Sequence, residues 1–352
     1  MARNPAGFAS ETIDVKDAHK FDEGRLVAYL EENIDGFAGP LTVKQFEGGQ
    51  SNPTYFLSTP SRNYVLRRKP PGRLVKSAHA VEREFRVIHA LNATDFPVPH
   101  AYVLCEDPDV IGTSFFVMSH VPGQARRDVS MPDLAPSARR SLVNSFIDAM
   151  AMLHGYDHVG LGLADFGPPG NYFARQVSRW SRQYRETETE KLAEMHELIA
   201  WLEKSIPEQT RTTIVHGDYS FHNLLCHPTE PRIAAVLDWE LSTIGDPLGD
   251  FTYFTQPWFA PPGEGSIGGK DLKALGIPTY AEMRDRYCER TGASLANEAF
   301  YRAFHAFRSG AILQGIIRRA LDGTNAGSMA YEFTPAVVRA GALRGLEWVK
   351  RA

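Results

Sequence analysis

Three oxygen-bearing side chains follow two short apolar runs near the middle of the chain. Asp218 and Asn223 are five residues apart after the first run, and Asp238 ends the second run, at residues 233–237. A turn with two prolines separates the segment 224–226 from the second run, so we expect these two segments to pair as a hairpin. The hairpin would return Asp238 to the loop that contains Asp218 and Asn223.

Such a set of groups suits phosphoryl transfer, which depends on positioning and on neutralisation of charge. A carboxylate such as Asp218 can orient an attacking hydroxyl and accept its proton. Asn223 and Asp238 supply the hard oxygen ligands that Mg²⁺ prefers beside phosphates. Two other interpretations stay open: a polar turn with an N-capping aspartate, and a hydrolytic site in which His216, Asp218 and His222 bind a transition metal.

The same order and interval occur in the catalytic loop of protein kinases, where an arginine stands in the place of Gly217. Because it has glycine at this place, the chain resembles the aminoglycoside phosphotransferase and choline kinase-like family, whose motif is H-G-D-x-x-x-x-N and then D-x-[DE]. The matching residues are His216, Gly217, Asp218, Asn223, Asp238 and Glu240. The resemblance implies an α+β, protein-kinase-like two-lobed fold with ATP and Mg²⁺ as cofactors. We place an antiparallel-sheet N-lobe in residues 1–121 and a mostly helical C-lobe in residues 122–352.

A small antiparallel sheet should precede the catalytic motif, after an unpatterned arm at residues 1–20. Strands are predicted at 41–46, 54–58, 63–68, 101–105 and 114–120. In the loop after the first of these strands, Gly48 and Gly49 allow backbone amides to approach phosphates closely, and Ser51 and Asn52 add donors. Glycines in a hairpin also serve turn geometry alone.

The third strand presents Arg67 where the kinase pattern has lysine. Arginine stays charged and can grip oxygens through two nitrogens, but it is longer and bulkier than lysine. In kinases a glutamate on the following helix holds this cation. On the helix predicted over residues 79–91, the resemblance favours Glu84 for this role, while Glu82 remains possible and either could be surface charge.

The resemblance also assigns Met118, Ser119 and Val121 to a hinge that holds adenine through backbone groups. The apolar character of this segment would equally fit a core strand. Asp250 corresponds to a kinase aspartate that accepts hydrogen bonds from the catalytic-loop backbone, so we assign it a supporting role. His216 is expected to support the same loop.

The second half of the chain has long helical patterns. Helices are predicted at 137–155, 171–188, 190–205, 279–291, 297–321 and 334–351. The Pro- and Gly-rich segment 256–270, which contains Trp258, is too long for a simple connector and is interpreted as a substrate-side lid. Trp258 with Arg318 and Arg319 would suit an anionic acceptor with an apolar part, whereas the acidic run 186–194 would suit a polycation. Ordinary surface arginines are the simpler interpretation of Arg318 and Arg319.

Composition limits the possible partners. The 352 residues include 43% hydrophobic residues and have a formal net charge of -4, so no overall basic field favours nucleic acid or an anionic membrane. Three cysteines at no metal-like spacing, and no apolar segment after the polar N-terminus, favour a reduced cytoplasm. We also find no apolar stretch long enough to span a bilayer.

We therefore expect an ATP-dependent kinase that acts on a hydroxyl of a small molecule. Within the family, the chain is most similar to the kinase-like domains related to those fused to acyl-CoA dehydrogenases. This likeness implies a hydroxyacyl-CoA acceptor and a functional link to acyl-CoA dehydrogenase chemistry. An aminoglycoside-type or other amino-alcohol kinase is the alternative, and a non-catalytic nucleotide-binding protein is an alternative of another class. The choice between ATP and GTP, the oligomeric state and the roles of His222 and Glu240 stay open.

Overall fold

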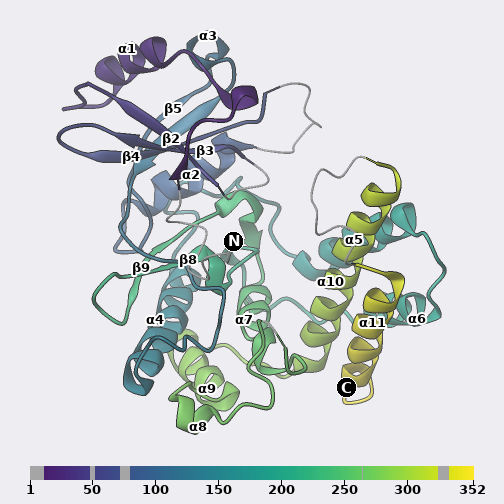
Figure 1. Cartoon of the computed structure of the whole chain (residues 1–352). Helices are drawn as coiled ribbons and strands as arrows, with labels where there is room; N and C mark the ends of the chain where they lie inside the picture. The colour runs from purple at the N-terminus through teal and green to yellow at the C-terminus, as the bar shows by residue number, and fades with distance from the viewer. Residues whose placement is uncertain (1–11, 48–51, 72–79, 264, 324–332) are drawn as a thin grey trace. The chain divides into compact units, whose positions relative to one another are not determined.

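A computed structural model describes residues 12–47, 52–71, 80–263, 265–323 and 333–352. Two compact units make up the chain (Figure 1). The first unit contains Met1–Gly167, His216–Thr243 and Pro257–Gly292, and the second contains Pro168–Val215, Ile244–Gln256 and Ala293–Ala352. Segments distant in sequence thus fold together in each unit, and the lobe boundary expected near residue 121 stays a prediction.

A six-stranded antiparallel sheet with the order β1-β2-β3-β4-β6-β5 belongs to the first unit (Figure 1). The strands are β1 (Thr12–Ile13), β2 (Thr42–Phe46), β3 (Thr54–Ser58), β4 (Asn63–Arg68), β5 (Ala101–Cys105) and β6 (Phe115–Ser119). The five predicted strands are confirmed. The expectation of a loose arm over residues 1–20 is wrong for its described part, because residues 12 and 13 pair with β2 as an edge strand.

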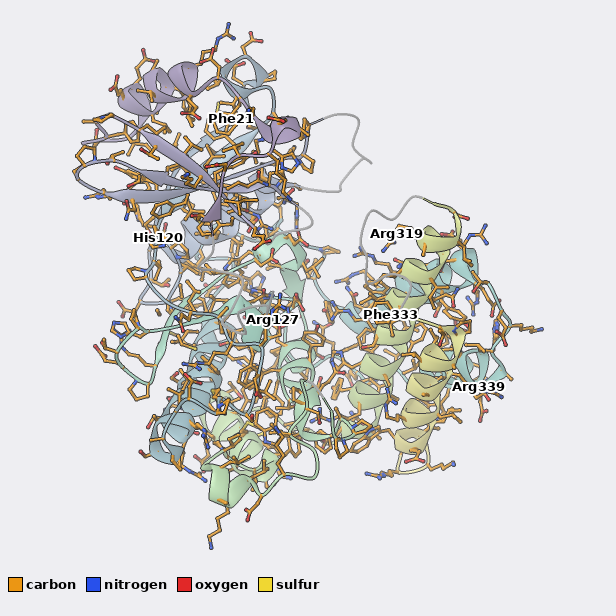
Figure 2. All side chains as sticks on the ribbon, viewed as in Figure 1. Phe21, His120, Arg127, Arg319, Phe333 and Arg339 are labelled. Atoms are coloured by element: carbon orange, nitrogen blue, oxygen red, sulfur yellow. The ribbon has the colours of Figure 1, made fainter. Side chains whose placement is uncertain are left out.

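One face of the sheet is covered by α1 (Glu23–Asn33) and α3 (Pro108–Ile111). Leu26 and Leu30 of α1 are fully buried in a cluster with Tyr55 from β3. Phe21, labelled in Figure 2, packs edge-on against the ring of Tyr55 at 5.1 Å. This face is therefore an apolar core.

The opposite face receives α2 (Val81–Leu91), whose Phe85 packs against Phe116 of β6 at 6.0 Å. Side chains alternate along β4, so consecutive arginines point to opposite faces of the sheet. Arg68 is buried on the α1 side, where it donates hydrogen bonds to the carbonyls of Ile111 and His19. Arg67 is left on the face that α2 covers.

The first unit continues with helices α4 (Pro136–Gly155), α8 (Leu272–Leu275) and α9 (Tyr280–Thr291). It also contains the antiparallel hairpin of β8 (Leu224–Cys226) and β9 (Ile233–Val236). The predicted hairpin and the predicted helices at 137–155 and 279–291 are confirmed. Residues 256–270 form only a short 3-10 turn at Gln256–Trp258 within the described part of that segment.

The second unit is helical. It contains α5 (Tyr172–Thr187), α6 (Ala193–Lys204), α7 (Leu248–Phe254), α10 (Glu298–Leu321) and α11 (Pro335–Val349), together with β7 (Thr213–Val215), which pairs with β10 (Thr243–Gly245). Helix α10 packs against each of the other four, and α11 runs beside it (Figure 1). The four long helices predicted for this region are confirmed within three residues at each end.

Bilayer-spanning character is absent from the described helices, none of which is both long and apolar enough to cross a membrane. Cys105 and Cys226 are buried, Cys288 is half-buried, and all three are free thiols. The expected cytoplasmic location stays a prediction.

Candidate active site

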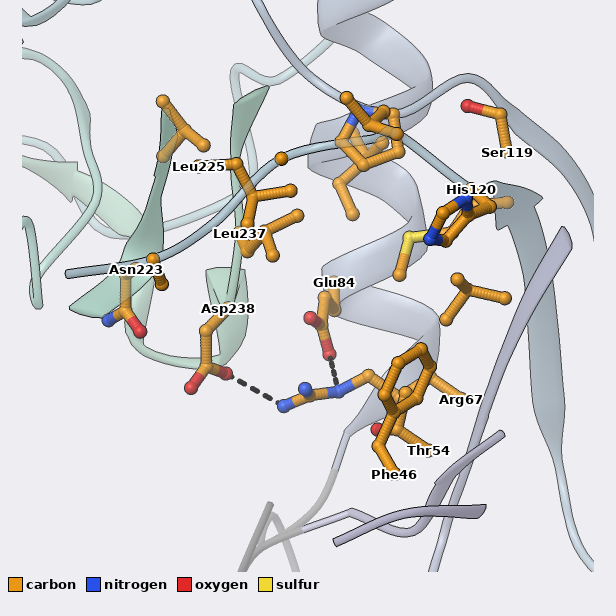
Figure 3. Close-up of a pocket in the computed structure, with 18 of the residues that line it drawn as sticks. Phe46, Thr54, Arg67, Glu84, Ser119, His120, Asn223, Leu225, Leu237 and Asp238 are labelled. Atoms are coloured by element: carbon orange, nitrogen blue, oxygen red, sulfur yellow. Dashed lines mark hydrogen bonds and ion pairs between the residues drawn. The ribbon is translucent and has the colours of Figure 1, made fainter. Parts of the chain in front are cut away.

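The β8–β9 hairpin holds Asn223 and Asp238 at the same edge of a pocket (Figure 3). Asn223 immediately precedes β8, and its carbonyl accepts a 2.8 Å hydrogen bond from the amide of Leu237 after β9. Asp238 follows with φ at 64°, a left-handed conformation that aspartate tolerates better than most residues. Local hairpin geometry thus brings together the two predicted metal ligands.

Gly217 lies where the predicted catalytic loop, residues 216–223, passes close to the segment that follows β9. Its φ is 82°, and a side chain there would place its first carbon 2.5 Å from the carbonyl oxygen of Leu241. Any larger residue would be strained and would push the two segments apart. This close approach gives a structural reason for glycine where the protein-kinase loop has arginine.

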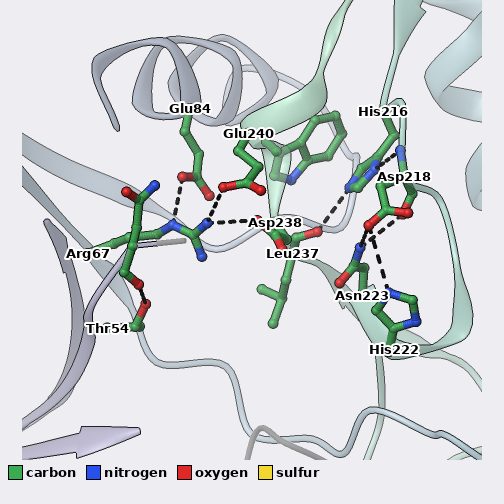
Figure 4. A network of polar contacts seen from close by, with 12 residues as sticks. Thr54, Arg67, Glu84, His216, Asp218, His222, Asn223, Leu237, Asp238 and Glu240 are labelled. Atoms are coloured by element: carbon green, nitrogen blue, oxygen red, sulfur yellow. Dashed lines mark hydrogen bonds and ion pairs between the residues drawn. The ribbon is translucent and has the colours of Figure 1, made fainter. Parts of the chain in front are cut away.

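His216 is fully buried and connects the loop to the hairpin (Figure 4). Its Nδ1 accepts a 3.2 Å hydrogen bond from the amide of Asp218, and its Nε2 lies 2.9 Å from the carbonyl oxygen of Leu237. Because a carbonyl can only accept, Nε2 must donate, so the ring has its single proton on Nε2. The geometry fits the supporting role proposed for His216.

The carboxylate of Asp218 is oriented by its neighbours. Asn223 Nδ2 donates to the Asp218 backbone carbonyl at 2.9 Å and to its Oδ2 at 3.0 Å. The amide oxygen of Asn223 is thereby turned to the Asp238 side of the pocket (Figure 4). His222 Nε2 lies 3.7 Å from Asp218 Oδ2 on a largely exposed side chain.

Arg67 is surrounded by three carboxylates (Figure 4). Its Nε makes an ion pair with Glu84 Oε2 at 2.8 Å, although neither atom has hydrogen-bond geometry. Its Nη2 donates a hydrogen bond to Asp238 Oδ1 at 2.7 Å and a longer one to Glu240 Oε2 at 3.4 Å. Arg67 therefore connects the sheet and helix α2 to the residue after the hairpin.

The choice between Glu84 and Glu82 as the neighbour of Arg67 follows from the helix. Glu84 is buried and faces Arg67, whereas Glu82 pairs with Lys69 at 2.6 Å. The contact with Glu240 was left open by the sequence. The sequence feature that could have indicated this contact is the second acidic residue of the D-x-[DE] motif, which lies two residues after Asp238.

Burial is the largest influence on the pKa of Glu84, and it raises that pKa to about 7. The Arg67 guanidinium opposes the rise, while Asp238 and Glu240 add to it. Burial tends to lower the pKa of Arg67, but the three carboxylates outweigh burial and raise it. One guanidinium among three acidic groups leaves excess negative charge, which suits a divalent cation.

The pocket next to this cluster has an apolar wall. Its lining includes Phe46, Val65, Ile88, Met118, Leu225 and Val236, together with Ser119 and Val121 of the predicted hinge. Thr54, directly opposite Arg67 across β3 and β4, also lines it. Sequence reasoning missed Phe46 and Thr54, although alternation along their strands puts Thr54 on the Arg67 face.

Helix α2 is also held on its outer side. Arg83 donates to the carbonyl of Phe166 at 2.7 Å, and its guanidinium lies 4.3 Å from the centre of that ring. Arg86 makes an ion pair with Asp165 and donates to the carbonyl of Gly162 at 2.8 Å. Both arginines thus fix the helix that positions Glu84, a role that sequence reasoning missed.

The structure does not show the role of several predicted site residues. Gly48, Gly49 and Ser51 lie outside the described residues, and Asn52 is buried at the end of their loop. Asp250 is buried on α7 in the second unit. Their predicted roles stay predictions.

The predicted acceptor residues belong to different units. Trp258, in the first unit, packs near Phe221 of the catalytic loop at 6.3 Å and donates to the carbonyl of Pro278 at 2.8 Å. Arg318 and Arg319 are exposed on α10 in the second unit, and Arg318 pairs with Asp322 at 3.1 Å. A joint acceptor site therefore stays a prediction.

The alternative of a transition-metal site is not supported by the donor geometry. Both ring nitrogens of His216 are used in hydrogen bonds to backbone groups. Across the described parts of the chain, no three His, Cys, Asp or Glu side chains form a group that could hold a metal ion. The oxygen donors of Asn223 and Asp238 instead match the preference of Mg²⁺.

Comparison with known proteins supports the resemblance to phosphotransferases. A model of the phosphotransferase enzyme family matches residues 42–296. A crystal structure from Ralstonia eutropha, provisionally named an aminoglycoside phosphotransferase, has a TM-score of 0.87 at 45% identity and covers 95% of this chain and 99% of that one. The complex of APH(4)-Ia with ADP and hygromycin B has a TM-score of 0.57 at 16% identity, covering 92% and 97%, and bears on the fold alone. The protein-kinase-like α+β fold is confirmed.

Curated relatives are longer than this chain. Acyl-CoA dehydrogenase family member 11 of Gallus gallus is 40% identical over 351 residues, which cover 97% of this chain and 45% of that protein. Acyl-CoA dehydrogenase family member 10 of Mus musculus is 43% identical over 298 residues, which cover 84% and 28%. The chain thus spans less than half the length of these relatives.

Proposed function

The chain belongs to the phosphotransferase enzyme family, and we propose that it is a small-molecule kinase that transfers the γ-phosphoryl group of ATP to the hydroxyl of a hydroxyacyl-CoA. The observation that supports this proposal is the pocket that brings Arg67, Glu84, Asn223 and Asp238 beside an apolar wall. A cation, two oxygen donors and an apolar surface match the phosphates, the metal and the base of a nucleotide.

The base would lie against the apolar wall. The amides of Ser119 and His120 donate to the carbonyls of His100 and Asn63, at 2.8 and 3.3 Å. Val121 lines the pocket, and its amide has no hydrogen-bond partner among the described residues. It is therefore our candidate donor to a ring nitrogen of adenine.

The phosphates would lie toward Arg67. The amide oxygen of Asn223 and the carboxylate of Asp238 would hold Mg²⁺, which neutralises phosphate charge when bound. Arg67 would add its own positive charge, and Glu84 would hold the guanidinium in place. An ADP complex of a structural neighbour adds support for nucleotide binding at this fold.

Asp218 would act on the acceptor. Its carboxylate would accept a hydrogen bond from the acceptor hydroxyl and take the proton as the hydroxyl oxygen bonds to the γ-phosphorus and the bond from that phosphorus to the bridging oxygen breaks, releasing ADP. The hydrogen bond from Asn223 to Asp218 Oδ2 fixes the carboxylate for this task. His216 would hold the loop that presents Asp218.

We infer an acyl thioester of coenzyme A as the acceptor from the chemistry that such a ligand would need. Its phosphates would need local cations and its acyl part would need an apolar surface. Arg318 and Arg319 are the cations that the sequence predicted for this ligand, and Trp258 is the predicted apolar side chain. The longer relatives named after acyl-CoA dehydrogenases add a link to acyl-CoA chemistry. A polycationic aminoglycoside would instead need an acidic pocket.

A competition between acceptors tests the proposal. The purified chain is incubated with Mg·ATP and a mixture of hydroxyacyl-CoA thioesters, choline and kanamycin, and the products are identified by mass. We expect phosphorylated thioester only. Phosphorylated kanamycin or choline would support the amino-alcohol alternative, and tight nucleotide binding with no product from any acceptor would support the non-catalytic alternative.

A further inference from the structure

Glu240 lies close enough to Arg67 to act as an alternative hydrogen-bond acceptor for its Nη2. Arg67 Nη2 is shared between Asp238 Oδ1 at 2.7 Å and Glu240 Oε2 at 3.4 Å. The nearer partner is also a proposed metal ligand. Asp238 thus has two prospective cationic partners, and only one of them is part of the chain.

A cation at Asp238 would weaken the contact with Arg67. A divalent ion draws on the charge of the same carboxylate and repels the guanidinium, because like charges a few ångströms apart disfavour each other. Arg67 would then need another acceptor for Nη2, since an unpaired charge in a largely buried position is costly. Glu240 is within reach of the same nitrogen.

We propose that Glu240 is a positioning residue that takes over Arg67 Nη2 when Asp238 binds Mg²⁺. The inference rests on the proposed function, because it assumes that a metal–nucleotide complex occupies the pocket. The ion pair of Arg67 with Glu84 lacks hydrogen-bond geometry before this exchange, so the guanidinium has a better alignment to gain by turning.

The proposal also explains why this site has two acids after the hairpin and an arginine on β4. A guanidinium has separate nitrogens for Glu84 and for the exchange between Asp238 and Glu240, whereas an ammonium has one. Arg67 can therefore keep Glu84 while Nη2 changes its partner. The planar group connects the buried helix to whichever acid is free of metal.

Nucleotide affinity with and without metal tests the role of Glu240. The dissociation constant of a non-hydrolysable ATP analogue is measured by calorimetry in Mg²⁺ and in EDTA, for the wild type, Glu240→Gln and Glu240→Ala. A hydrogen bond to a charged group corresponds to roughly tenfold in affinity or more. We expect the gain in affinity that Mg²⁺ produces to be about tenfold smaller in Glu240→Gln than in the wild type, and smaller again in Glu240→Ala. The affinity measured in EDTA should be the same in all three proteins.

The matched control is Glu82→Gln, which removes an acid of the same helix as Glu84 that pairs with Lys69. It should leave the effect of Mg²⁺ unchanged. Equal loss of affinity in Mg²⁺ and EDTA for the Glu240 variants, or no loss in either, would overturn the proposal while the proposed function stands. No nucleotide binding by the wild type would remove the proposed function and this inference together.

Metal binding without nucleotide tests the exchange itself. Free Mn²⁺ is measured by electron paramagnetic resonance during titration of the wild type, Arg67→Met and Arg67→Met/Glu240→Gln. Removal of the guanidinium from three acidic groups should strengthen Mn²⁺ binding about tenfold, and loss of the Glu240 charge should reverse part of that gain. Unchanged Mn²⁺ affinity in Arg67→Met would show that Arg67 does not compete with metal at Asp238.

Discussion

Replacement of Arg67 and Glu84, singly and together, tests whether the two side chains act as a unit. Arg67→Met keeps most of the apolar stem and removes the charge, and Glu84→Gln keeps the shape of the carboxylate. Only 11% of the Arg67 side chain and 2% of the Glu84 side chain are exposed. Arg67→Met therefore leaves the buried carboxyl of Glu84 without its cation, and Glu84→Gln leaves Arg67 with only Asp238 and Glu240 as acidic neighbours.

The magnitude follows from that burial. Removing one partner of a buried ion pair costs roughly 3–5 kcal/mol of unfolding free energy. Because the pKa of Glu84 is raised to about 7, this carboxyl can take a proton at neutral pH and avoid part of the penalty. We expect a loss of about 3 kcal/mol for Arg67→Met and a coupling of about 2 kcal/mol between the two changes. Contacts of Arg67 with Asp238 and Glu240 are lost in both backgrounds and cancel in the cycle.

Urea unfolding and the KM for ATP of all four proteins provide the measurement. The control cycle uses Lys69 and Glu82, which connect β4 to α2 at 2.6 Å but with 23% and 34% of their side chains exposed. A partly exposed pair of this kind couples by about 1 kcal/mol or less. Additive effects of Arg67→Met and Glu84→Gln, or equal coupling in the two cycles, would refute the reasoning.

Other changes address the proton, the pH response and the acceptor. Asp218→Asn should lower kcat by about 10²-fold or more and leave the Kd for ATP nearly unchanged, and steady-state kinetics with near wild-type turnover would exclude Asp218 as the base. Because burial raises the pKa of Glu84 to about 7, the folded protein keeps this proton longer than the unfolded chain, so unfolding free energy should fall as pH rises toward 7. Urea unfolding without nucleotide or metal should show a smaller fall in Glu84→Gln, and an equal fall in both proteins would contradict the assignment. Arg318→Ala and Arg319→Ala should raise the KM for a hydroxyacyl-CoA about tenfold or more while that for ATP changes little, and the reverse pattern would move the acceptor cations elsewhere.

Local sequence patterns predicted the elements around the site because each depends on neighbouring residues. Alternation and turn residues gave the strands and the β8–β9 hairpin, and the hairpin alone brings Asn223 to Asp238. The resemblance to the family favoured Glu84 over Glu82 as the partner of Arg67. The roles of Gly48 and Gly49 stay untested, since these residues lie outside the described part of the chain.

Local sequence patterns could not predict contacts between segments that are distant in the chain. Arg86 and Asp165 are 79 residues apart and meet because α2 packs beside a loop after α4. The contact of Arg67 with Glu240 needs the sheet and the hairpin to be placed together first. The pairing of residues 12 and 13 with β2 has no pattern, because a two-residue edge strand has too few positions to alternate.

Transfer of the γ-phosphoryl group to an acceptor hydroxyl is the central claim, and a single-turnover experiment tests it most directly. Enzyme in excess over Mg·ATP labelled in the γ-phosphoryl group is mixed with a hydroxyacyl-CoA and quenched at intervals. We predict that the label appears on the hydroxyl of the thioester as ADP forms, and that Asp218→Asn slows this step by about 10²-fold. Label released only as inorganic phosphate, at the same rate with and without the thioester, would contradict the account.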